Sequence, residues 1–190
     1  MSVQDFYETV RSNLEYYTEL NAETDGKWIC VSRIPERMKS QEGLDVFLRE
    51  LQDMQTALDG WGQKLCFHPV STDFCAVPGV DAVGYLLEVM PELELCLDLY
   101  HLNRCCQDMP GYIRRYAGRI CMVHLKDSIG DTLVPAGQGE VNWTGVVRAC
   151  LEAGVPYAFV EQECWQRDPY LCLKEASDWL NREICAVKGA

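Results

Sequence analysis

RICMVHLKD, residues Arg119–Asp127, is an apolar run that ends in an imidazole, an ammonium and a carboxylate. Three other stretches have the same form: LCFHP at Leu65–Pro69, LELCLDLYH at Leu93–His101 and YAFVEQE at Tyr157–Glu163. Apolar runs without clean alternation, bounded by Gly, Pro or Asp, are typical of parallel strands that are buried on both faces. The four stretches therefore predict parallel strands that carry metal-capable side chains at their carboxyl ends.

Amphipathic stretches between these runs predict helices. In GLDVFLRELQDMQTALDGWG, residues 43–62, apolar residues recur at three- and four-residue spacings, which is typical of a helix with one buried face. The expected strands are Trp28–Ile34, Leu65–Val70, Leu93–Tyr100, Ile120–Leu125 and Tyr157–Glu161, and shorter helices are expected at Val80–Val89, Met109–Tyr116, Thr144–Ala153 and Tyr170–Ile184. This alternation predicts an α/β fold, and the polar segment Ser128–Trp143 is expected to be a loop over the site.

Composition and net charge indicate one globular domain and argue against some partners. With 190 residues, 48% of them hydrophobic, the chain is expected to form one domain over residues 1–190. The eleven cysteines show no C-x-x-C spacing and the N-terminus lacks the pattern of a signal peptide, so we expect reduced thiols in the cytoplasm and no membrane segment. A net charge of −12 argues against a nucleic-acid partner.

The strand ends offer a set of metal ligands. Functional groups of parallel α/β proteins gather at the carboxyl ends of strands. Asp98, His124 and Glu161 form a mixed oxygen and nitrogen donor set that suits Mn, Co, Mg or Zn, and His68 is a candidate fourth ligand. Each of these side chains taken alone can also be a hydrogen-bonded core residue. Thiolate ligation is a competing interpretation, although strand-interior thiols usually behave as small hydrophobes; its candidates are Cys66, Cys96, Cys121 and Cys164.

Several short motifs in one order give the chain a family resemblance. From about Asn13 to Leu180 it resembles the sugar phosphate isomerase/epimerase group of xylose isomerase-like TIM barrels, through CFHPVSTDF, LDLYH, MVHLKD, PAGQGEVNW and FVEQE. The resemblance implies a metal-dependent (β/α) barrel enzyme that acts on a sugar, a sugar phosphate or an inositol-like compound.

The resemblance also implies roles for individual residues. Asp98 and His124 match metal-ligand positions, and Glu161 matches a carboxylate that contacts the metal and serves as acid/base. Lys126 would stabilise negative charge on a substrate oxygen, or form a salt bridge with a neighbouring carboxylate. Residues expected to contact the substrate are His101, Glu163, Gly137 and Gly139.

The length of the chain departs from that of a full barrel. A (β/α)₈ barrel needs about 250 residues, and about five strand-helix units are found here, corresponding to strands four to eight. The sequence thus predicts a partial TIM-type barrel with exposed edges. Open edges need cover, so a homo-oligomer or a partner chain is expected.

Two functions remain open at this point. The leading hypothesis is a divalent-metal-dependent isomerase or epimerase that works by enediolate proton transfer, or an inosose-type dehydratase. The alternative is a truncated, non-catalytic remnant or split-barrel subunit that binds metal or ligand. Phosphodiester hydrolysis would require more ligands and a basic groove, and no G-x-S-x-G signature of a serine nucleophile is present.

Overall fold

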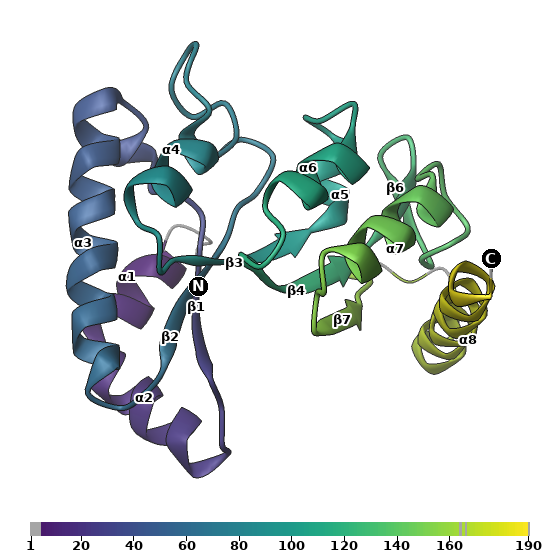
Figure 1. The fold of residues 1–190 in the computed structure, drawn as a ribbon, viewed down its shortest axis with the longest axis horizontal. Helices are drawn as coiled ribbons and strands as arrows, with labels where there is room; N and C mark the ends of the chain where they lie inside the picture. The colour runs from purple at the N-terminus through teal and green to yellow at the C-terminus, as the bar shows by residue number, and fades with distance from the viewer. Residues whose placement is uncertain (1–4, 164, 166, 190) are drawn as a thin grey trace. The chain divides into compact units, whose positions relative to one another are not determined.

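The computed structural model describes residues 5–163, 165 and 167–189. The chain packs into two compact units, one ending at Cys96 and the other beginning at Leu97. In each unit parallel strands alternate with helices (Figure 1), so the α/β class predicted from the sequence is confirmed. Among the described residues, no helix is both long enough and apolar enough to span a bilayer. The expectation of a single domain stays a prediction.

The first unit is built around three parallel strands. Strand β1 (Trp28–Ser32) pairs with β2 (Lys64–His68), and β2 pairs with β3 (Glu94–Asp98), whose last two residues belong to the second unit. The helical segments of the first unit are α1 (Asp5–Ser12), α2 (Leu14–Glu23), the 3₁₀ helix η1 (Glu36–Met38), α3 (Gln41–Asp59) and α4 (Ala82–Val89).

Helix α3 shows why the periodic stretch folds as predicted. The Ser40 hydroxyl caps its N-terminus by accepting a hydrogen bond from the Gly43 N–H at 3.0 Å. Its apolar stripe is buried against β2 and η1, and the Phe47 ring lies 5.1 Å from Tyr7 and 5.7 Å from Phe67, measured between ring centroids. This aromatic cluster is part of the core of the first unit.

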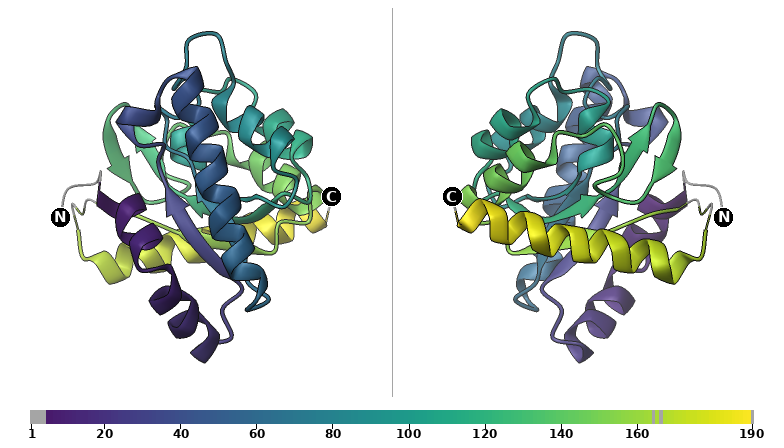
Figure 2. Two further views of the ribbon diagram at one scale, coloured as in Figure 1. Left: turned by 90° about the vertical axis from the view of Figure 1, so that its left-hand side faces the viewer. Right: turned by 90° about the vertical axis from the view of Figure 1, so that its right-hand side faces the viewer.

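The second unit contains the remaining strand pair. Strand β4 (Ile120–Leu125) pairs in parallel with β7 (Tyr157–Val160), while β5 (Asp127–Ile129) and β6 (Thr132–Val134) form an antiparallel hairpin. Its helices are α5 (Leu99–Asn103), α6 (Met109–Arg115), α7 (Trp143–Glu152) and α8 (Pro169–Lys188). Figure 2 shows α8 as one long, continuous helix.

Most predicted boundaries shift by a few residues, and two differences bear on the site. The third strand was expected to reach Tyr100, but it ends at Asp98, because the Asp98 carboxylate caps α5 and so turns the chain into a helix. The segment Ser128–Trp143 was expected to be a loop throughout, yet its first part pairs as β5 and β6. The rest of it connects to α7.

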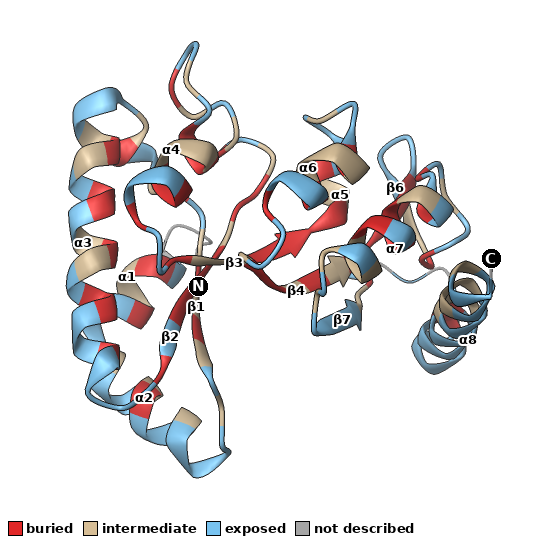
Figure 3. Cartoon of the chain, viewed as in Figure 1, coloured by how far each residue is buried: buried red, intermediate tan, exposed pale blue. Residues whose placement is uncertain are grey.

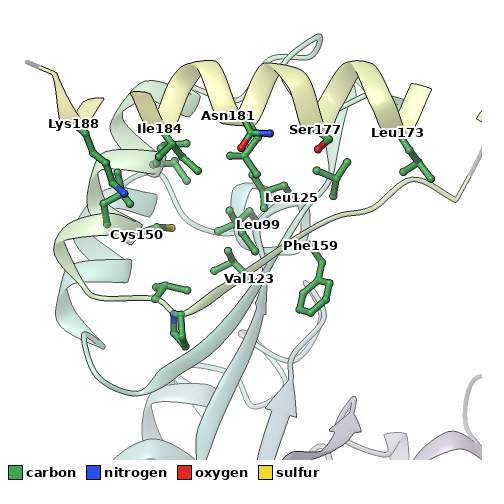
Figure 4. A pocket seen from close by; sticks show the side chains of 18 residues that line it. Leu99, Val123, Leu125, Cys150, Phe159, Leu173, Ser177, Asn181, Ile184 and Lys188 are labelled. Carbon is green, nitrogen blue, oxygen red and sulfur yellow. The ribbon is translucent and has the colours of Figure 1, made fainter. Parts of the chain in front are cut away.

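The second unit has an incompletely covered apolar surface. Figure 3 shows β7 and most of α8 as exposed, and the Phe159 side chain on β7 is 50% exposed. A cleft of about 650 Å³ lies between α8 and the strands, and in Figure 4 Leu173 and Ile184 of α8 point toward the strands that carry Val123 and Leu125. Exposed apolar side chains next to an apolar cleft can serve as an interaction site.

Candidate metal centre

Asp98 is held at the end of β3 by the helix that it caps. Its Oδ1 accepts hydrogen bonds from the backbone N–H of Tyr100 at 2.8 Å and of His101 at 3.3 Å. The carboxylate is fully buried, and its other oxygen, Oδ2, lies 3.2 Å from Lys126 Nζ. One oxygen thus fixes the backbone, and the second faces the side chains of the neighbouring strand end.

His124 and Glu161 meet across the pair of strands β4 and β7. His124 Nδ1 lies 2.7 Å from Glu161 Oε2. The hydrogen bond from His124 lowers the pKa of Glu161 to about 2; partial burial opposes this effect, and the positive charge of Lys126 adds to it. Glu161 is therefore ionised at neutral pH, as a metal-binding carboxylate must be.

Lys126 lies in the middle of the strand-end carboxylates. Its Nζ is 3.0 Å from Glu161 Oε1 and 3.1 Å from Glu163 Oε1, in addition to the contact with Asp98, and its side chain is 4% exposed. Burial alone would lower the pKa of Lys126, but the surrounding carboxylates outweigh it and raise that pKa above its usual value. Lys126 is therefore a permanent cation, and the salt bridge predicted as one of its two roles is present.

The donor set fits a divalent cation. Asp98, His124 and Glu161 each offer one ligand atom, and these three atoms lie within 4.8 Å of one another. Two carboxylate oxygens and one imidazole nitrogen suit Mn²⁺, Co²⁺, Mg²⁺ or Zn²⁺. The structure thus brings together three of the four residues predicted as ligands.

The fourth predicted ligand, His68, lies in the first unit. Its Nδ1 is 3.5 Å from the Ser32 hydroxyl at the end of β1, and its role as a ligand stays a prediction. Of the cysteines named as competing ligands, Cys66, Cys96 and Cys121 are buried within strands, and Cys164 lies outside the described residues. None of the ten cysteines that the structure describes forms a disulfide.

His101 lies close to the ligands, together with Tyr100, which was not predicted as a site residue. His101 Nε2 is 4.0 Å from Asp98 Oδ2, and its ring contacts the Tyr100 ring edge-on. The Tyr100 ring centroid lies 6.0 Å from Lys126 Nζ, at the limit of a cation–π contact. Tyr100 follows Asp98 by two residues in LDLYH, so its place at a strand end was the signal that could have pointed to it.

The loop glycines contact Asp127. The backbone N–H groups of Gly137 and Gly139 donate to Asp127 Oδ2 at 3.1 and 2.9 Å, and Trp143 Nε1 donates to the same oxygen at 2.6 Å. A Cβ on Gly137 would lie 2.3 Å from the Trp179 ring, and one on Gly139 would lie 2.1 Å from Asp127 Oδ1. In this structure the glycines let the backbone approach Asp127 closely, and their contact with a substrate stays a prediction.

Comparison with known proteins agrees with this architecture. The family model of the xylose isomerase-like TIM barrel matches residues 4–183. This match covers nearly the whole chain, and the chain therefore belongs to the xylose isomerase-like TIM barrel family. A comparison with curated proteins gives no match.

Solved structures of low sequence identity share the fold. A sugar phosphate isomerase/epimerase from Parabacteroides distasonis superposes with a TM-score of 0.78 at 16% identity, over 98% of this chain and 69% of that one. An L-ribulose 3-epimerase gives a TM-score of 0.74 at 15% identity, over 94% and 68% of the two chains. The IolI protein, crystallised with a bound zinc atom, gives a TM-score of 0.68 at 16% identity, over 98% of this chain and 72% of that one.

The Asp127 network generates a stability prediction. Asp127→Ala should lower the free energy of unfolding by about 3 kcal/mol, because the N–H donors of Gly137, Gly139 and Trp143 lose their acceptor. Urea denaturation followed by tryptophan fluorescence measures this change. Asp131→Ala is the control, since Asp131 is 91% exposed and should cost less than about 0.5 kcal/mol. Equal effects of the two substitutions would contradict the proposed anchoring.

Proposed function

We propose that this chain is a divalent-metal-dependent isomerase or epimerase of a sugar or sugar phosphate. The observation that carries the proposal is the convergence of Asp98, His124 and Glu161 within 4.8 Å at the carboxyl ends of three strands. Membership of the xylose isomerase-like family supports it, as do structural neighbours named as an isomerase/epimerase and as an L-ribulose 3-epimerase. An inosose-type dehydratase begins with the same proton removal and is included in the proposal.

Metal binding, proton transfer and charge stabilisation are assigned to individual side chains of the site. A divalent ion held by Asp98, His124 and Glu161 would polarise a hydroxy-carbonyl unit of the substrate and acidify the adjacent C–H bond. Glu161 then takes that proton, the C–H electron pair forms the C=C bond of an enediolate, and the π pair of the carbonyl group moves onto its oxygen. Lys126 stabilises the negative charge on this oxygen, and Glu161 returns the proton to carbon.

Substrate contact is proposed for His101, Glu163, Gly137 and Gly139. His101 extends from α5 beside Asp98, and the Glu163 side chain is 64% exposed, so both can reach a bound hydroxylated molecule. Imidazole and carboxylate groups suit hydrogen bonding to sugar hydroxyls.

We also propose that a second copy of this chain covers the apolar cleft of the second unit. None of the described residues that line the cleft is acidic, so two chains of charge −12 could meet there without placing carboxylates against each other. The exposed Tyr157, Phe159 and Leu173 would be buried in such a dimer.

Metal binding is the first expected outcome. Isothermal titration of the chelator-treated protein with Mn²⁺ should give one site per chain, weakened at least about 100-fold by His124→Ala or Glu161→Ala, since each change removes a ligand. Asp178→Asn is the control, because Asp178 pairs with Lys174 on α8, 2.5 Å away. If neither Mn²⁺, Co²⁺, Mg²⁺ nor Zn²⁺ binds, the metal-dependent proposal fails.

Proton exchange tests the chemistry. Ketoses, their phosphates and inosose-like compounds, incubated with the Mn²⁺-loaded protein in D₂O, should gain deuterium at the carbon beside the carbonyl group, as NMR detects. Glu161→Gln should slow this exchange at least about 100-fold because it removes the base. Glu175→Gln, a change of an exposed residue paired with Arg167, should leave it unaltered. Metal uptake without exchange of any compound would favour the non-catalytic remnant or split-barrel subunit.

The dimer is tested by light scattering. The purified chain should have twice the mass of one chain, and Leu173→Lys should shift it toward the monomer by placing a charge in the cleft. Val46→Lys is a matched control, because Val46 is also exposed and apolar but lies on α3 in the first unit. A monomeric wild-type chain would exclude self-association and leave a different partner chain as the cover.

A further inference from the structure

We infer that Lys126 competes with the divalent cation for the same carboxylate oxygens, and that Glu163 is a positioning residue which retains Lys126 when the cation binds. The inference rests on the proposed metal site. In the structure, Lys126 contacts each of three carboxylates, those of Asp98, Glu161 and Glu163.

Lys126 already forms ion pairs with oxygens of two of the proposed ligands, Asp98 and Glu161. Asp98 uses Oδ1 to cap α5, so Oδ2 is the oxygen turned toward the other ligands, and Lys126 Nζ is 3.2 Å from it. The ammonium is also 3.0 Å from Glu161 Oε1, while Glu161 Oε2 faces His124. Two cations that share these oxygens repel each other, and the repulsion is strong where water is largely excluded.

The charged side chains at the strand ends carry a net negative charge that a divalent cation would balance. Asp98, Glu161 and Glu163 contribute three negative charges, and Lys126 contributes one positive charge, which leaves a net charge of −2. A divalent cation neutralises this remainder. Without Lys126 the cluster would carry −3, and its attraction for a divalent cation would rise.

Glu163 differs from the other two carboxylates in its exposure. Its side chain is 64% exposed, compared with 31% for Glu161 and 0% for Asp98. It lies at the outer side of the cluster, where water solvates it, and it already contacts Lys126 at 3.1 Å. Lys126 can therefore leave Asp98 and Glu161 and keep one charged partner. This shift also frees an oxygen of Glu161, the proposed base.

Titration of the 190-residue chain with Mn²⁺ at one fixed pH tests the inference. Lys126→Met should bind Mn²⁺ about tenfold more tightly than the wild type, and Glu163→Gln should bind it more weakly, because Lys126 then stays on Asp98 and Glu161. Lys174→Met is the matched control, because it removes the same charge from a lysine on α8 that pairs with Asp178 and not with a proposed ligand. It should leave the affinity for Mn²⁺ unchanged within about twofold.

Thermal unfolding gives a second measurement. Metal-free Lys126→Met should unfold at a lower temperature than the wild type, and Mn²⁺ should raise its Tm by more than it raises that of the wild type. If Lys126→Met does not fold, Lys126→Gln keeps a hydrogen-bond donor without the charge and should show the same gain in affinity. Equal or weaker Mn²⁺ binding by the folded Lys126 variant, with wild-type binding intact, would overturn the competition and leave the metal site standing. Absence of binding in every protein would instead refute the proposed function, and the inference with it.

Discussion

The buried ammonium of Lys126 is the interaction on which the strand ends of the second unit depend. A cation with 4% of its side chain exposed is tolerated only among compensating charges, and Asp98, Glu161 and Glu163 supply them. These carboxylates come from β3 and from the end of β7, while Lys126 follows β4. Neutralisation of Lys126 therefore holds Asp98 and Glu161 close together, and Glu161 in turn contacts His124.

The two-residue period of a strand explains how one sequence serves both the site and the core. His124 and Lys126 are two residues apart at the end of β4, and both side chains contact Glu161. Val123 and Leu125 project to the other side and line the apolar cleft beneath α8. A shift of register by one residue would exchange the two sets, which is why the hydrophobic pattern also fixes the chemistry.

The sequence predicted the strands and the grouping of Asp98, His124 and Glu161, because uninterrupted apolar runs and strand-end polar residues are local signals. It did not predict the helix after Asp98, because an aspartate at the end of an apolar run can either continue the strand or cap a helix. Nor did it choose between the two roles of Lys126, because a lysine beside one strand gives no information about the carboxylates on its neighbours.

Asp98 and Asp127 show why only a few carboxylates of an acidic chain can serve as metal ligands. Asp127 accepts N–H bonds from Ser128, Gly137, Gly139 and Trp143, which is about the full capacity of a carboxylate. Asp98 spends one oxygen on two backbone N–H groups and turns the other toward Lys126. A structural carboxylate therefore differs from a candidate ligand in how many of its lone pairs already accept hydrogen bonds from backbone and side-chain N–H groups. Sequence position alone does not reveal that number, because the donors to Asp127 come from as far as sixteen residues away.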